Sequence, residues 1–279
     1  MTNYRLARAL CAATLVLFLN GCSSGPSAPQ PGTPAFYWGA AGETWRAGDY
    51  LKTLDDLSHL TADQNEFTVK ARPWEILVAS GIARGYVDLA DAAETAMKKS
   101  PARAIPIRRQ MTAWRGSANG TALELADTFQ KFAITSKETS VSLEFSWPPV
   151  GNAASPTQLD RFESGAPLSD ADIEGLETAM LQRAVMLAAA RITGSGEDTA
   201  KAQEVFRQPR PAVPAETFLV NLGQAFYDLS ALYGPRKLDT PHRHDMMITL
   251  ATMALKPYPQ DKAATSLLQK IQSDSKAKR

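Results

Sequence analysis

Apolar side chains return every three to four residues over most of this chain, and this spacing limits the possible folds more than any other feature of the sequence. From residue 35 to residue 132, aromatic and aliphatic residues recur at helical spacing. The same periodicity resumes after Ser169 and continues to residue 271. The sequence therefore predicts an all-α protein built from helical hairpins.

Glycines and capping residues divide the first helical region into pairs. Helices are expected over residues 36–46 and 49–60, on either side of Gly48. A capping box is expected at residues 61–64, where Thr61 and Gln64 would each satisfy a free backbone donor at a helix start. Further helices are expected over residues 73–84, 87–99, 102–114 and 121–132, with breaks at Gly85, Gly116 and Gly120.

The spacing of apolar residues changes in the middle of the chain. Over residues 139–147, Val141, Leu143, Phe145 and Trp147 alternate with polar residues, which is strand spacing. A single strand is not stable alone, so this segment is expected either to add to a partner's edge or to lie as an extended linker over the helices. The prolines and glycines of residues 148–167 predict a loop.

Ser169 opens the second helical region, because a serine followed three residues later by Asp172 is typical of a helix start. Helices are expected over residues 173–192, 199–207, 215–233, 245–255 and 261–271.

The first 21 residues have the order of a secretory signal peptide. Arg5 and Arg8 precede an apolar run over residues 9–19, which as a helix spans only about 16 Å against roughly 30 Å of hydrocarbon. The next residues complete Leu19-Asn-Gly-Cys22, which resembles the lipobox of bacterial lipoproteins. An ordinary signal peptide followed by a chance cysteine is the alternative.

The lipobox resemblance implies that Cys22 is acylated, becomes the new amino terminus and attaches the protein to membrane lipid. Ser23 and Ser24 then imply transfer to the outer membrane, facing the periplasm, within the cell envelope. Cys11 lies in the removed segment, so no cysteine would remain for a disulfide. The expected organisation is a signal peptide (1–21), a flexible tether (22–34), N-terminal helical repeats (35–134), an extended connection (135–168), a C-terminal helical region (169–272) and a disordered tail (273–279).

Two segments resemble the hairpin closure of tetratricopeptide repeats. Gly48-Asp-Tyr50 and Gly85-Tyr86 each place a glycine before an aromatic residue, 37 residues apart, close to the family period of about 34. The resemblance implies stacked hairpins with a concave surface that holds a peptide or another protein. On this basis the candidate binding face consists of Tyr37, Ala41, Ile76 and Leu77.

No catalytic, cofactor or metal site is predicted. His242 and His244 could bind a metal beside Asp245, but the cluster supplies no third ligand at convincing spacing, and Asp245 could instead cap the helix that follows. Neither a GxSxG motif nor a P-loop is present. Removing Arg5 and Arg8 leaves 28 basic against 29 acidic residues, a balance that does not point to nucleic acid.

Two groups of side chains allow a second interpretation. Arg103, Arg108, Arg109 and Arg115 could form a basic face for anionic lipid or an acidic partner, or simply the solvated side of a packed helix, which we favour. The aromatic residues could line a ligand pocket, although aromatic residues at helical spacing more often form a core; they are Phe36, Tyr37, Trp38, Trp45, Tyr50 and Trp74.

The expected function is therefore that of a lipid-anchored scaffold that binds a protein or peptide and requires no cofactor. A cell-wall-acting enzyme and a solute-binding accessory of a transporter are the alternatives.

Overall fold

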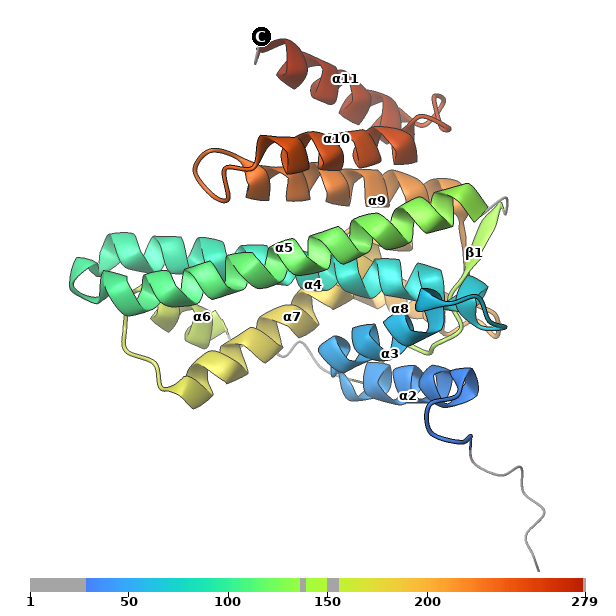
Figure 1. Cartoon of the computed structure of the whole chain (residues 1–279), viewed down its shortest axis with the longest axis horizontal. Helices are drawn as coiled ribbons and strands as arrows, with labels where there is room; N and C mark the ends of the chain where they lie inside the picture. The colour runs from blue at the N-terminus through green and yellow to red at the C-terminus, as the bar shows by residue number, and fades with distance from the viewer. Residues whose placement is uncertain (1–28, 136–138, 150–155, 278–279) are drawn as a thin grey trace, which may run out of the picture.

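The computed structural model describes residues 29–135, 139–149 and 156–277. The fold is all-α with one short extended segment, as predicted (Figure 1). The α-helices are α2 (Pro34–Ala47), α3 (Tyr50–Ala62), α4 (Thr68–Lys99), α5 (Ala104–Thr135), α6 (Pro156–Glu163), α7 (Asp170–Ile192), α8 (Thr199–Phe206), α9 (Ala215–Ser230), α10 (Pro241–Leu255) and α11 (Lys262–Ala277). Two 3-10 turns, η1 (Pro101–Arg103) and η2 (Ala231–Tyr233), and two strands, β1 (Ser140–Ser142) and β2 (Ala212–Pro214), complete the described elements.

The first hairpin, α2 and α3, turns at Gly48 as predicted. Gly48 adopts a left-handed conformation with φ of 76°, and its N–H donates to the Trp45 carbonyl over 3.1 Å. The Asp49 side chain then caps α3 by accepting from the Lys52 N–H. A glycine is favoured here because a side chain would strain this backbone conformation.

The next two helices are longer than predicted. α4 and α5 each run for 32 residues and lie side by side along their length (Figure 1). The expected breaks at Gly85, Gly116 and Gly120 are therefore wrong. The capping box expected at residues 61–64 is also wrong, because Thr61 belongs to the last turn of α3 and α4 begins after Phe67.

Close helix packing explains why Gly85 lies inside a helix. A Cβ on Gly85 would lie 2.9 Å from Leu181 Cδ2, and one on Gly81 would lie 2.5 Å from the Val185 Cα. Both contacts are with α7, so these glycines let α7 cross α4 at short range. Gly116 and Gly120 instead face open space, where a helix tolerates glycine at a cost of about 1 kcal/mol each.

The middle segment links the two halves of the chain. Only residues 140–142 form a strand, and it pairs antiparallel with β2 of the same chain, placing Val141 opposite Val213. Residues 143–149 form an extended linker over the first hairpin, where Trp45 Nε1 donates to the Ser146 carbonyl over 2.8 Å. The predicted loop over residues 148–167 is wrong in part, because α6 lies within it.

The second helical region starts as predicted. Ser169 and Asp172 form a reciprocal capping box at the start of α7. α10 begins at Pro241, four residues before the predicted start. α11 continues to Ala277, so most of the tail that was expected to be disordered is helical.

The aromatic residues of the first hairpin are largely core, as favoured from the sequence. Trp45 and Trp74 are fully buried, with ring centroids 4.8 Å apart, and Phe145 of the linker packs on Trp74 at 4.6 Å. Trp38 covers the outer side of Phe145 at 4.6 Å. The linker is thus part of the core that holds α2 and α3 against α4.

One carboxylate joins the three central helices. Glu177 of α7 accepts a hydrogen bond from the Tyr86 hydroxyl of α4 over 3.0 Å and one from Trp114 Nε1 of α5 over 2.9 Å. The two donors occupy both of its oxygens, which fixes the position of α7 relative to the α4–α5 pair.

Candidate functional site

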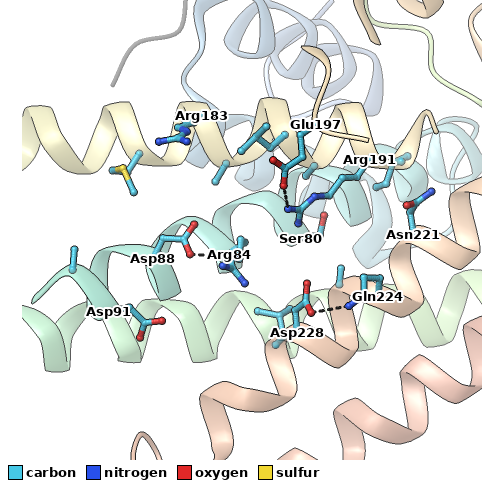
Figure 2. A pocket seen from close by; sticks show the side chains of 18 of the residues that line it. Ser80, Arg84, Asp88, Asp91, Arg183, Arg191, Glu197, Asn221, Gln224 and Asp228 are labelled. Carbon is cyan, nitrogen blue, oxygen red and sulfur yellow. Dashed lines mark hydrogen bonds and ion pairs between the residues drawn. The ribbon is translucent and has the colours of Figure 1, made fainter. Parts of the chain in front are cut away.

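The candidate site is a cavity of about 450 Å³ between α4, α7 and α9, with α6 at its edge. Its volume lies within the range of roughly 300–1,000 Å³ that is typical of ligand pockets. Figure 2 shows polar side chains from all three helices converging on this space. The central position of α4 and the close crossing of α7 set the spacing of two of its walls.

α4 contributes a polar stripe to the cavity. The helix is buried along most of its length, and such a helix is expected to be apolar on every side. The polar stripe therefore marks the side of α4 that is open to solvent, and the cavity lies along it. The residues of the stripe recur at intervals of three or four: Ser80, Arg84, Asp88, Asp91 and Thr95.

α7 and α9 form the other walls of the cavity, again with residues that recur at helical spacing. Arg183, Leu187 and Arg191 face the cavity from α7, and Gln224 and Asp228 face it from α9. Between the charges lies an apolar floor, so the cavity is amphipathic; the floor consists of Ala92, Met180, Ala184, Leu187, Ala188, Leu222, Ala225 and Leu229. None of the described residues that line the cavity is aromatic.

Several of the cavity charges are already paired. Arg84 Nε lies 2.8 Å from Asp88 Oδ1 within α4. Arg191 Nη2 of α7 lies 2.6 Å from Glu197 Oε1, in the turn that follows (Figure 2). These pairs hold two guanidinium groups at the rim of the cavity.

A lysine from the loop after η2 reaches the α4 wall. Lys237 Nζ contacts both carboxylate oxygens of Asp91, at 2.6 and 2.9 Å. This contact joins the loop before α10 to the cavity wall, so the position of Asp91 depends on the C-terminal helices.

Charged side chains of both signs remain available to a ligand. Within the described ranges, Arg183 makes no ion pair or hydrogen bond, and Asp228 accepts only from the neutral Gln224 amide, over 2.8 Å. Arg183 lies on the α7 wall and Asp228 on the α9 wall (Figure 2). The cavity can therefore offer a ligand the Arg183 cation, the Asp228 carboxylate and, at its α6 edge, the Glu163 carboxylate.

Burial also affects the ionisation of the α4 stripe. Desolvation raises the pKa of Asp88 above its ordinary value, and the nearby Arg84 guanidinium opposes this shift. An additional cation from a ligand would stabilise the charged form of Asp88, because an opposite charge favours ionisation.

The face expected from the repeat resemblance does not form an open surface. Ala41, Ile76 and Leu77 are fully buried in the core. Tyr37 is half-buried and stacks on His59 with ring centroids 4.3 Å apart. This expectation is wrong because the predicted second hairpin is instead part of the long α4, whose apolar residues pack against α5 and α7.

The histidine cluster lies at the start of α10. Thr240 precedes the helix and Asp245 is inside it, so the capping role suggested for Asp245 is wrong. His244 Nδ1 lies 3.2 Å from Asp245 Oδ1. Over residues 29–135, 139–149 and 156–277, no three histidine, cysteine or acidic side chains are grouped as metal ligands.

A second hollow, of about 730 Å³, lies between the α2–α3 turn and α7. It is more open than the cavity, and its charged lining residues in the described chain are all acidic: Asp49, Asp170, Glu174 and Glu177. Glu177 is already bound to Tyr86 and Trp114, so this hollow offers less to a ligand.

Two acids lie apart from the cavity: Glu75 of α4 and the half-buried Glu124 of α5. Glu75 is almost fully buried and accepts a hydrogen bond from the Thr128 hydroxyl over 2.8 Å. Burial, together with the nearby Glu75 and Asp55, raises the pKa of Glu124 to about 7. These residues affect how stability depends on pH.

The described helices include none that is long and apolar enough to cross a membrane. Cys22 and the signal segment lie outside the described residues. Searches of family models, curated proteins and solved structures gave no match to this chain.

Proposed function

We propose that this protein is a lipid-anchored binding protein of the cell envelope whose α4–α7–α9 cavity holds a short peptide with both a carboxylate and a cationic group. The observation that carries the proposal is that three helices turn charged side chains of both signs onto one apolar floor. Several of these charges, such as those of Asp88 and Asp228, are half-buried, and partial burial of a charge costs free energy unless the charge has a partner. A ligand that supplies the missing partners would explain why they are there.

The available charges favour a zwitterionic ligand. Arg183 would bind the ligand carboxylate, since a guanidinium matches a carboxylate in two parallel hydrogen bonds. Asp228 would accept from the ligand ammonium group, and the apolar floor would contact the side chains between them. A peptide with free ends carries these two charges at its termini.

Attachment to the envelope rests on the sequence. Acylated Cys22 would hold the protein at the membrane, most simply the outer membrane facing the periplasm. The eleven residues 23–33 precede α2 and would let the folded part stand up to roughly 33 Å from the bilayer.

The test is calorimetric titration of the whole protein with a panel of tripeptides that have free termini. The same peptides with acetylated and amidated ends serve as ligand controls. We expect binding of the free peptides, with Arg183→Gln and Asp228→Asn each weakening it by roughly 10- to 100-fold, the effect of losing one charged hydrogen bond. Arg210→Gln, at an exposed position away from the cavity, is the matched control and should leave affinity unchanged.

Two outcomes would contradict the proposal. One is equal affinity for free and blocked peptides, which would show that the charges do not select the ligand. The other is steady hydrolysis of the peptides, lost on changing Asp88 or Asp228, which would favour the enzyme alternative.

A further inference from the structure

The connection between α4 and α5 carries an unusual balance of charge. Residues 95–123 contain six basic residues and no aspartate or glutamate. The segment covers the end of α4, the η1 turn and the first half of α5, and the connection forms the left end of the molecule in Figure 1. We name as the basic tip the residues Lys98, Lys99, Arg103, Ile105, Arg108 and Arg109.

Not all six cations are free. Arg115 is buried and lies 3.1 Å from Glu94, which also contacts Lys98 at 2.9 Å. Arg103 Nη1 donates to the Gly165 carbonyl over 2.8 Å, so it secures the loop before α7. These three residues have structural partners.

The remaining three cations have none among the residues that the structure describes. Lys99, Arg108 and Arg109 are all exposed and take part in no ion pair there. Together they form a cationic surface that no internal acid neutralises.

An exposed apolar side chain lies in the same segment of the chain as these cations. Ile105, in the first turn of α5, is 70 % exposed, and its neighbours Ala102 and Pro106 are exposed as well. One exposed isoleucine is ordinary on a protein surface. Arg108 and Arg109 follow Ile105 by three and four positions on α5, the spacing of a shared helix face, and Lys99 ends α4 across the η1 turn. An exposed isoleucine beside cations is typical of an interfacial membrane contact, where the apolar side chain enters the lipid and the cations bind phosphate.

We propose that the basic tip docks on an anionic phospholipid bilayer, with Ile105 in the headgroup region and Lys99, Arg108 and Arg109 on lipid phosphates. The combination of an exposed apolar side chain and unneutralised cations favours a bilayer over an acidic protein, whose surface would not require the isoleucine. This inference does not depend on the cavity or its ligand. Each exposed cation should strengthen the partition onto an anionic surface roughly fivefold.

The test places an environment-sensitive fluorophore at residue 102. The full chain carries Cys11→Ser and Cys22→Ser, so that Ala102→Cys is the one site of labelling. Vesicles contain either phosphatidylglycerol mixed with phosphatidylcholine or phosphatidylcholine alone, and a nitroxide lipid serves as quencher. A label at Met253→Cys, an exposed position on α10, is the matched control.

We expect the label at residue 102 to shift to the blue and to be quenched only with phosphatidylglycerol vesicles at about 0.1 M salt. The signal should disappear at about 1 M salt, where charges are screened within roughly 3 Å. It should also be lost in the triple variant Lys99→Gln, Arg108→Gln, Arg109→Gln and reduced in Ile105→Ser, with circular dichroism showing that the helices persist. The label at residue 253 should not respond in any of these conditions.

Equal signals with both kinds of vesicle, or a triple variant that binds like the parent, would overturn the proposal. So would a label at residue 102 that responds to poly-glutamate but not to phosphatidylglycerol, since that result would indicate an acidic protein as the partner.

Discussion

Val185 of α7 lies directly over Gly81 of α4, so that a Cβ at residue 81 would be 2.5 Å from the Val185 Cα. The contact is with backbone, which cannot move without shifting a whole helix. We therefore expect Gly81→Ala to lower the free energy of unfolding by about 1–3 kcal/mol, the usual cost of overpacking. Urea denaturation followed by circular dichroism would measure it.

Gly116→Ala is the control for this substitution. Gly116 is also inside a long helix but has nothing within 4 Å of its would-be Cβ. Its replacement should raise stability by up to about 1 kcal/mol, because alanine favours the helix. If both substitutions destabilised the protein equally, the close crossing of α4 and α7 would not be the cause.

Removal of the Glu177 carboxylate should loosen the three central helices. In Glu177→Ala, the Tyr86 hydroxyl and the Trp114 indole would both lose their acceptor, and we expect a loss of about 1.5–3 kcal/mol in unfolding free energy. Glu174→Ala, an exposed acid one turn earlier on α7, should change stability by no more than about 0.5 kcal/mol. Equal effects of the two changes would show that the hydrogen bonds contribute nothing specific.

Glu124 should make the protein less stable as the pH rises. Its pKa in the folded state is about 7, above the ordinary value of 4.5, so folding favours its protonated form. The resulting stability is present below pH 4.5 and is lost as the pH rises to about 7. Glu124→Gln should therefore be more stable than the parent at pH 8, by on the order of 1 kcal/mol, with little difference at pH 4.

Denaturant titrations of parent and variant at both pH values would measure this difference. Glu66→Gln, at an exposed position in the turn between α3 and α4, is the control and should not alter the pH dependence. A parent and a Glu124→Gln variant with parallel pH profiles would contradict the expectation.

The lipobox makes a separate prediction about attachment. Cys22→Ala should move the protein from the membrane fraction to the soluble fraction of cells after a high-salt wash, which removes protein held by charge alone. Cys11→Ala, which alters a cysteine in the segment expected to be removed, should leave the protein in the membrane fraction. Retention of Cys22→Ala in washed membranes would show that Cys22 is not the anchor.

The sequence predicted most helices because their apolar spacing is a local property. It misplaced the breaks at Gly85, Gly116 and Gly120 because a glycine can end a helix, admit a neighbouring helix or simply be tolerated, and only the tertiary contacts distinguish these roles. β2 was missed because three residues carry too little periodicity, and α6 because the prolines and glycines around it predict a loop.

The cavity was missed for a related reason. The break expected at Gly85 separated Ser80 and Arg84 from Asp88 and Asp91, so their common face on α4 could not be recognised. A search for polar residues at helical spacing within a buried helix could have found that stripe. The partners on α7 and α9, such as Arg183 and Asp228, could not be assigned to it, because periodicity does not say which helices meet.

The extended linker over the first hairpin has a consequence for how the chain assembles. α2 and α3 leave the ribosome early, but Trp45 obtains its carbonyl partner, Ser146, only 101 residues later. Until that segment emerges, Trp38 and Trp74 also lack the ring of Phe145 that covers them. The nascent chain therefore exposes its most aromatic region until synthesis has passed the midpoint of the chain. During this interval, a chaperone that shields the region would protect the chain from aggregation.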